Sequence, residues 1–176
     1  DMLNITRPYR AVLCGPPGSS KTSVIKSLLC CADPLFERGW LWHPDPNAVT
    51  EGEYQDCGLE LLKDNKLPPT KFWFDINPDK KHMVLVIDDV DVSELRRDQK
   101  SLFDRLVSTA STHCSLTILL ASQVFFNLPT VCRKTANLFV LYKPISEEQD
   151  LKAISKRVGL PADTLSELFH DHCPNR

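Results

Sequence analysis

The stretch Gly15-Pro16-Pro17-Gly18-Ser19-Ser20-Lys21-Thr22 decides the fold of this chain. It follows the apolar run Ala11-Val12-Leu13-Cys14 and opens an apolar-periodic segment over residues 23–31, so its context is strand, glycine loop and helix. A loop of this kind directs successive backbone N–H groups and a helix N-terminus toward one point, which suits a chain of phosphates. The spacing therefore predicts a site for the phosphates of a nucleotide.

Two side chains of this loop carry specific expectations. Lys21 is expected to contact the β- and γ-phosphate oxygens, and the Thr22 hydroxyl is expected to ligate Mg²⁺. One position departs from the pattern G-x-x-x-x-G-K-[ST], because Ser20 stands where the second glycine is usual and must tolerate the backbone angles imposed there. The alternative is a glycine turn with a surface lysine. The predicted nucleotide-binding residues are Gly15, Pro16, Pro17, Gly18, Ser19, Ser20, Lys21, Thr22 and Ser23.

The composition is that of an ordinary globular protein. Of the 176 residues, 42% are hydrophobic and 25% are charged, and the formal net charge is -2. A chain this close to neutrality has no global basic footprint, so nucleic-acid contacts must come from local patches or from several copies. No signal peptide or membrane-spanning run is present, and no membrane partner is expected. The seven cysteines include no C-x-x-C pair, which indicates neither a zinc site nor a disulfide framework and fits a reducing compartment.

Buried strands and helices alternate along the chain. Strands are predicted over residues 10–14, 38–43, 83–87, 116–121 and 138–142, and an extended piece over 71–75. Helices are predicted over 23–31, 53–65, 101–111, 147–158 and 164–170. Trp40 and Trp42 are interpreted as packing residues of a strand rather than as a base-stacking platform. This alternation predicts an α/β sandwich with a mostly parallel sheet and with ligands at the carboxyl ends of the strands.

Two aspartates follow the continuous apolar run 83–87. Asp88 and Asp89 would therefore lie at the same edge of the sheet as the glycine loop. Asp88 is expected to hold Mg²⁺, and Asp89 to orient or deprotonate the water that attacks the γ-phosphate. The alternative is an acidic pair that caps the next turn, with Asp91 in support.

A polar amide follows the next predicted strand. Gln123 comes directly after the run 116–121 and the small residue Ser122, again at the carboxyl edge. Its amide can bond both the attacking water and a γ-phosphate oxygen, which makes it a candidate catalytic residue. The alternative is an amide that satisfies backbone groups of its own loop.

These motifs, in this order, resemble the FtsK-HerA superfamily. The likeness rests on the glycine loop, the strand ending Ile87-Asp88-Asp89, the helix reaching Thr112-His113-Cys114-Ser115, the strand ending Ser122-Gln123, and residues 138–143; it covers roughly residues 8–158. Within the superfamily, the sequence looks most like the genome-packaging ATPases of double-stranded DNA viruses of the poxvirus, virophage and Polinton kind. Residues 61–68 are similar to a stretch that those ATPases carry between the two nucleotide motifs. Asp89 stands where many superfamily members have glutamate.

The resemblance implies a P-loop NTPase of the RecA/ASCE-like type, a three-layer sandwich that forms one domain over residues 1–176. Its implied cofactors are ATP and Mg²⁺, and its implied activity is ATP hydrolysis coupled to movement of double-stranded DNA into a capsid. The implied assembly is a homo-oligomeric ring, a pentamer or hexamer, with capsid proteins left open as further partners. The implied location is the cytoplasm or nucleus of a host cell, with the virion left open. The polar chain ends leave open that the domain is excised from a longer chain.

A motor of this kind needs a cation that reaches the γ-phosphate from a neighbouring subunit. Arg133 is predicted to be this arginine finger, because it lies ten residues after Gln123 in an exposed segment that links two core strands. Arg105 remains a rival, and the alternative is a surface arginine.

DNA contacts are predicted at two basic clusters. One is Lys80-Lys81-His82, before the acidic strand, and the other is Arg96-Arg97 with Lys100, after it. The alternative for each cluster is a solvated charged face. A competing function for the whole chain is a nucleotide-dependent switch or assembly protein with little turnover. A small-molecule kinase is less favoured, because the acidic pair follows its strand directly and no basic lid segment is present.

Overall fold

The computed structural model describes residues 5–92, 94–125, 128–142 and 148–172. In this part of the chain, six strands form one sheet in the order β3-β2-β4-β5-β1-β6. Every neighbouring pair is parallel. The fold class predicted from the sequence is therefore confirmed. The strands are β1 (Arg10–Cys14), β2 (Arg38–Trp42), β3 (Leu59–Leu61), β4 (Met83–Ile87), β5 (Leu116–Ser122) and β6 (Leu138–Leu141).

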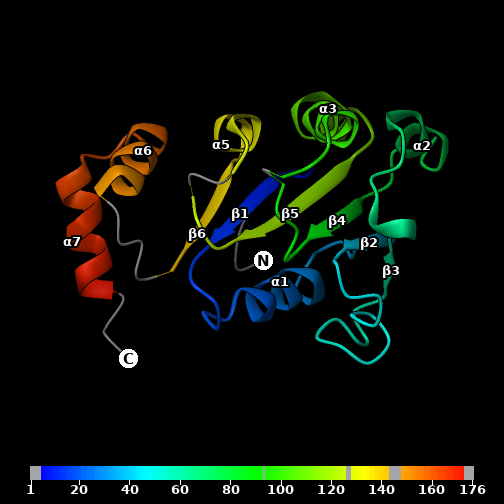
Figure 1. The fold of residues 1–176 in the computed structure, drawn as a ribbon, viewed down its shortest axis with the longest axis horizontal. Coiled ribbons are helices and arrows are strands. Elements are labelled where there is room, and N and C mark those ends of the chain that lie inside the picture. The colour runs from blue at the N-terminus through cyan, green and yellow to red at the C-terminus, as the bar shows by residue number, and fades with distance from the viewer. Residues whose placement is uncertain (1–4, 93, 126–127, 143–147, 173–176) are drawn as a thin grey trace.

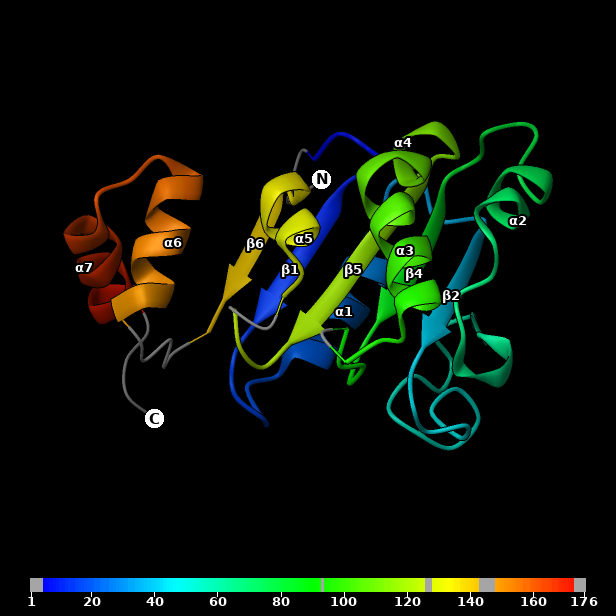
Figure 2. The same ribbon diagram turned by 45° about the horizontal axis from the view of Figure 1, so that its top comes forward.

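Helices cover both faces of the sheet and make the three layers. Helix α1 (Lys21–Cys30) lies on one face, and α2 (Thr70–Asp75), α3 (Arg97–Arg105) and α5 (Thr130–Thr135) lie on the other (Figure 1). Helices α6 (Glu148–Val158) and α7 (Ala162–His172) pack together beside the β6 edge (Figure 2). Short helical turns complete the fold at η1 (Lys63–Asn65), η2 (Leu106–Ala110) and α4 (Ser111–His113). None of the described helices is long and apolar enough to cross a membrane.

The sheet separates two apolar cores. All five residues of β4 are buried, as a strand covered on both faces requires. Trp40 and Trp42 belong to the core under α2 and α3, which confirms that they are packing residues. The other core lies under α1 and includes Tyr54, from the long segment 43–58 that follows β2. This segment therefore does part of the covering that a helix does elsewhere.

The helix predicted over residues 53–65 is wrong. The chain turns through residues 47–57, and Asp56 and Gly58 adopt φ values of 63° and 68°, which end any helical path. Leu59 and Leu61 alternate with period two, and the strand they form is paired with β2. Pairing with β2 therefore determines that residues 59–61 form a strand. The spacing of the leucines in the sequence does not reveal this pairing.

The extended piece predicted over residues 71–75 is also wrong, because these residues belong to α2. Phe72 and Trp73 of this helix make edge-on ring contacts with Trp40 of β2, at centroid distances of 6.3 and 5.3 Å. Burial of the aromatic face stabilises a helix of only six residues, which is too short to be stable by itself. The helix α5 was likewise not predicted.

Several buried cysteines behave as small apolar residues. Cys14, Cys114 and Cys132 are buried free thiols of the described chain. Burial raises the pKa of Cys14 and of Cys114 to about 11, and that of Cys132 to about 12. These thiols are therefore protonated at neutral pH and serve packing.

Candidate nucleotide-binding site

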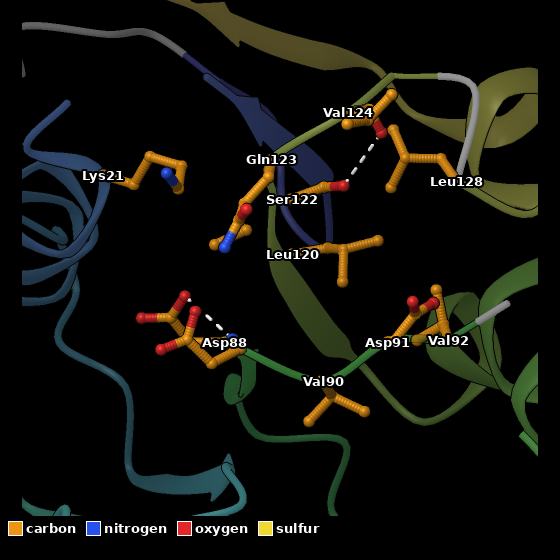
Figure 3. A pocket seen from close by; sticks show the side chains of 12 residues that line it. Lys21, Asp88, Val90, Asp91, Val92, Leu120, Ser122, Gln123, Val124 and Leu128 are labelled. Atoms are coloured by element: carbon orange, nitrogen blue, oxygen red, sulfur yellow. Dashed lines mark hydrogen bonds between the residues drawn. The ribbon is translucent and has the colours of Figure 1, made fainter. Parts of the chain in front are cut away.

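Three adjacent strands end beside one another at the carboxyl edge of the sheet. The strands β4, β5 and β1 are neighbours in the sheet order. Cys14 is in register with Ser122, and Ile87 is in register with Leu120, so the residues that follow emerge at one level. Figure 3 shows the consequence: Lys21, Asp88 and Gln123 border one cavity, although they lie far apart in the sequence.

The glycine loop turns the chain from β1 into α1. Gly18 has φ 71°, and Ser20, the residue before the helix, has φ 67° and ψ 27°. The left-handed conformation expected of the usual glycine is thus adopted by a serine, at a cost of roughly 1–2 kcal/mol for an L-residue. Gly15 is needed for a different reason. A Cβ atom at this position would lie 2.5 Å from the Cβ of Tyr142.

The lysine ammonium is held inside the loop. The Nζ atom of Lys21 donates hydrogen bonds of 2.8 Å to the carbonyl oxygens of Gly15 and Pro16. The Oγ atom of Ser19 lies 3.4 Å from the same nitrogen. The positive charge is therefore concentrated at the centre of the loop and beside the N-terminus of α1, where a phosphate chain is best stabilised.

Asp88 is a buried carboxylate, only 4% exposed, with three hydrogen-bond donors around it. Its Oδ2 atom accepts a hydrogen bond of 2.6 Å from the Tyr54 hydroxyl and one of 3.3 Å from the Thr22 hydroxyl. Its Oδ1 atom accepts a bond of 3.1 Å from the backbone N–H of Asp89. Burial, and then the negative charge of Asp88, raise the pKa of Tyr54 well above its usual value. Tyr54 is therefore a permanent donor that fixes the carboxylate.

The residues present fit a bound Mg²⁺ ion. Thr22 and Asp88 supply hydroxyl and carboxylate oxygens, which are the ligand types that Mg²⁺ prefers. The 3.3 Å between the Thr22 hydroxyl and Asp88 Oδ2 is close to the separation of about 3 Å between neighbouring ligands in an octahedral magnesium site. Both predicted metal-site residues thus lie together.

Asp89 lies beside the buried aspartate but differs in exposure. Its side chain is 61% exposed, and its Oδ2 atom lies 3.7 Å from Nε2 of His43. Its backbone has φ 55°, a left-handed conformation that aspartate tolerates better than most residues. Asp89 therefore faces the open space of the site, whereas Asp88 is enclosed.

Two hollows share Lys21, Asp88, Asp89 and Gln123 as lining residues. One, of about 410 Å³, is bordered by polar residues, which are Lys21, Asp88, Asp89, Asp91, Ser122 and Gln123, and by apolar residues, which are Val90, Val92, Leu120, Ala121, Val124 and Leu128. The other, of about 500 Å³, lies over the glycine loop and is bordered by residues 17–23, with Lys26, Glu53, both aspartates and Gln123. The predicted residues Ser19, Ser20, Thr22 and Ser23 are brought together there.

Sequence reasoning missed two residues of this site. Tyr54 and His43 belong to the segment after β2 and reach the aspartates only because β2 pairs with β4. No motif spacing connects them to the glycine loop. A faint signal exists for His43, which is the last residue of a predicted strand and is therefore expected near the same sheet edge.

The structure does not place Arg133 at the site of its own chain. It lies on α5, half-buried rather than on an exposed segment. Its guanidinium donates to the Thr130 hydroxyl at 3.4 Å, and its carbonyl oxygen accepts from Arg157 of α6. Neither hollow of the described residues is lined by it. Its role toward a neighbouring subunit stays a prediction.

Solved structures of known proteins share this fold. The genome packaging NTPase B204 of Sulfolobus turreted icosahedral virus 2, in complex with ATP-gammaS, superimposes with a TM-score of 0.63 at 18% identity, over 93% of this chain and 87% of that one. The chain has the fold of a P-loop NTPase.

Two further structures support this P-loop assignment. The DNA-packaging ATPase B204 of Sulfolobus turreted icosahedral virus gives a TM-score of 0.59 at 17% identity, over 94% and 88% of the two chains. The cytoplasmic domain of EssC gives 0.55 at 11% identity, over 82% of this chain and 33% of that one. The resemblance inferred from the sequence is confirmed at the level of the fold. No protein-family model and no curated protein sequence matches the chain.

Proposed function

We propose that this chain is an ATP-hydrolysing motor that moves double-stranded DNA, in the packaging of a viral genome into a capsid. The observation that carries the ATPase part is the joint placement of Lys21, Thr22, Asp88 and Gln123 at the ends of three adjacent strands. The packaging part is supported by two of the structures that share the fold, a genome packaging NTPase and a DNA-packaging ATPase of viruses. A likeness at 18% identity shows the fold alone, so the function is a proposal.

The residues divide the work of hydrolysis among them. The glycine loop and Lys21 would bind the phosphates, and Thr22 and Asp88 would hold Mg²⁺, which would neutralise charge on the phosphate oxygens. Asp89 is the carboxylate open to the hollow, so it is the one that orients and deprotonates the attacking water. Gln123 borders both hollows and bonds the same water or a γ-phosphate oxygen. Tyr54 keeps Asp88 in place.

Ring assembly would supply the missing cation. A single subunit offers Lys21 and Mg²⁺ against the charge of the transition state, and an arginine finger from a neighbour adds roughly a thousand-fold. We propose Arg133 as this arginine finger. The experiment mixes Arg133→Ala with Lys21→Ala, each of which is expected to be inactive alone. Mixed rings contain some interfaces with an intact loop and an intact finger, so recovered activity supports action in trans. Normal turnover of Arg133→Ala would remove the residue from the mechanism.

The two basic clusters differ in their position relative to the site. Lys80, Lys81 and His82 precede β4 and therefore lie at the opposite edge of the sheet, where Lys81 forms an ion pair of 2.8 Å with Glu37. The second cluster, with Arg96, lies at the start of α3, after β4. This cluster follows the carboxyl end of β4, the sheet edge that carries the candidate nucleotide site, and is the better candidate for a DNA contact that responds to hydrolysis.

A second segment adds to the cluster at α3. Gln99 accepts a hydrogen bond of 2.8 Å from the backbone N–H of Leu67, which fixes the 63–67 turn against the helix. Lys63 and Lys66 are exposed on this turn, and Arg97 and Lys100 are exposed on the helix, so the turn adds two cations to the segment beside α3. Phosphate binding depends on such repeated cationic contacts and weakens with salt.

The test measures ATPase rate with and without double-stranded DNA of random sequence, over a range of protein concentrations. Stimulation by DNA is expected, and a rate that DNA changes at no concentration counts heavily against a translocase. Alanine at Arg97 and Lys100 should abolish most of the stimulation and flatten its salt dependence. The matched control, alanine at Lys80 and Lys81, removes the same charge from the opposite edge and should retain the stimulation.

One observation favours a different function, a nucleotide-dependent switch with little turnover. Asp89 is one methylene shorter than the glutamate common in the resembling superfamily, and its carboxylate is exposed. A shorter base reaches less far toward the attacking water. Tight ATP binding with turnover too slow to measure, with or without DNA, would select the switch.

A further inference from the structure

The end of β2 brings His43 beside the second aspartate of the site. Nε2 of His43 lies 3.7 Å from Oδ2 of Asp89. The histidine side chain is 15% exposed and the aspartate 61%, so a largely enclosed ring faces an open carboxylate. The ring of Tyr54 packs edge-on to His43, with a centroid distance of 6.4 Å. The imidazole is thus held on one side by an aromatic ring that itself bonds Asp88.

A hydrogen bond on the far side of the imidazole decides where its proton is. The backbone N–H of Asp45 donates to Nδ1 of His43 at 3.0 Å. A backbone N–H can only donate, so Nδ1 must be an acceptor without a proton. In the neutral ring the proton is therefore on Nε2, the nitrogen that faces Asp89.

The backbone of Asp89 is restrained more than its side chain. Its backbone N–H bonds back to Asp88 and its φ is 55°, so the main chain turns sharply at this residue. The backbone is fixed, but an exposed aspartate side chain keeps its rotamer freedom. A carboxylate that must align a water molecule loses rate when it samples several rotamers.

We propose that His43 is a positioning residue, whose Nε2–H holds the Asp89 carboxylate in the orientation that aligns the attacking water. This inference rests on the proposed ATPase function. The present 3.7 Å is longer than a hydrogen bond, and a carboxylate shift of about 1 Å closes it to bonding distance. Catalytic hydrogen bonds commonly tighten in this way when substrate binds.

The competing explanation is that His43 only stabilises its own turn, through the bond from Asp45 to Nδ1. Two substitutions separate these roles, because each copies one ring nitrogen. In His43→Asn the short amide oxygen can still accept from Asp45, but the side chain no longer reaches Asp89. In His43→Gln the longer amide N–H takes the place of Nε2–H, while the acceptor for Asp45 is lost.

The experiment compares kcat and the Kd for a fluorescent ATP analogue in wild type and both variants. His43→Asn should lower kcat by about ten-fold or more, as loss of a supporting hydrogen-bond partner typically does, with Kd unchanged. His43→Gln should keep most of the wild-type kcat. In an Asp89→Asn background, His43→Asn should cause no further loss, because both residues act at one carboxylate. A wild-type kcat in His43→Asn, or equal losses in both variants, overturns the proposal.

A measurement without turnover separates this inference from the proposed function. Nitrogen-15 NMR of the histidine side chains, with the His43 signals assigned by their loss in His43→Gln, reports which ring nitrogen carries the proton. Protonated Nε2 and bare Nδ1 are expected in the nucleotide-free protein. The opposite tautomer overturns the positioning role even if the protein is an active ATPase. The protein could instead show the expected tautomer and yet hydrolyse no ATP. That result would overturn the proposed ATPase function and, with it, the catalytic role of His43.

Discussion

The glycine loop and the segment 43–58 both reach Asp88, but they do so by different physical means. The loop contacts it through Thr22, the residue after Lys21, and its shape follows from local backbone chemistry between β1 and α1. The segment 43–58 contacts it through the Tyr54 hydroxyl, eleven residues along from His43 in a run of turns. The first contact is encoded by spacing in the sequence, and the second depends on where a long segment folds back.

This difference separates two kinds of functional residue. Groups that bind the nucleotide need a fixed spacing, because phosphate oxygens and backbone N–H groups must match over a few ångströms. Side chains that hold those residues in place need only lie within contact distance of them, and they can come from any segment of the chain. The five predictions that follow test how far the two regions differ, from the largest expected effect to the smallest.

Removal of the lysine of the glycine loop should have the largest effect. Lys21→Ala takes away the ammonium at the centre of the loop, so ATP hydrolysis should fall below detection and nucleotide binding should weaken. Turnover and equilibrium binding of a fluorescent ATP analogue measure both. Lys156→Ala removes an exposed lysine of α6 and should leave both unchanged. Retained turnover in purified Lys21→Ala would refute the assigned phosphate site.

The two aspartates should separate binding from chemistry. Asp89→Asn should still bind ATP but hydrolyse it about a hundred-fold more slowly, because an amide cannot accept the proton of the attacking water. Asp88→Ala should lose the Mg²⁺-dependent activity at every magnesium concentration. Rates over a magnesium titration distinguish these outcomes. Full activity of Asp89→Asn would transfer the role to another carboxylate, such as Asp91.

Loss of the tyrosine hydroxyl tests the segment 43–58 by stability. Tyr54→Phe removes a 2.6 Å donor from the buried Asp88 carboxylate, so the free energy of unfolding should fall by about 1.5–3 kcal/mol. Denaturant unfolding at pH 7 measures it. The control Tyr142→Phe removes a 3.4 Å bond from an exposed hydroxyl to the Ser20 carbonyl and should cost under about 0.5 kcal/mol. If Tyr54→Phe lowered the free energy of unfolding no more than Tyr142→Phe, the contact with Asp88 would add nothing to stability beyond an exposed hydroxyl.

The same tyrosine predicts a pH dependence. Its pKa is raised in the folded protein, so the unfolded chain, with an ordinary tyrosine pKa of about 10, loses this proton first as pH rises. The contribution of Tyr54 to stability is therefore complete below about pH 10 and is lost progressively above it. In Tyr54→Phe this part of the alkaline loss should disappear.

The smallest effect should come from the backbone of the glycine loop. Ser20→Gly relieves a left-handed serine, and after the extra chain entropy of glycine is subtracted, stability should rise by about 0.5–1 kcal/mol. Gly18→Ala is the opposite change at φ 71°, with no atom within 4 Å of the new Cβ, and should destabilise through strain alone. Unfolding midpoints report both. Ser20→Gly without any gain would show that the serine hydroxyl compensates for its strain.

The segments that were predicted wrongly differ from the correctly predicted strands in the source of their stability. The strands with continuous apolar runs, such as β4 and β5, were predicted almost to their ends, since burial on both faces leaves a strong local signal. Segment 53–65 was not, because β3 forms by pairing at the edge of β2. Helix α2 was not predicted for a related reason, because it is stabilised by packing of its aromatic residues against Trp40, which lies far away in the sequence.

By itself, the sequence determined the phosphate loop, the parallel α/β class, and the placement of Asp88, Asp89 and Gln123 at one edge of the sheet. These features depend on short-range spacing and on the rule that parallel strands end together. Only the tertiary structure decided that Tyr54 holds Asp88 and that His43 faces Asp89. Both contacts join segments more than thirty residues apart, and such contacts are set by strand order and by the packing of a long loop, which no local pattern of residues specifies.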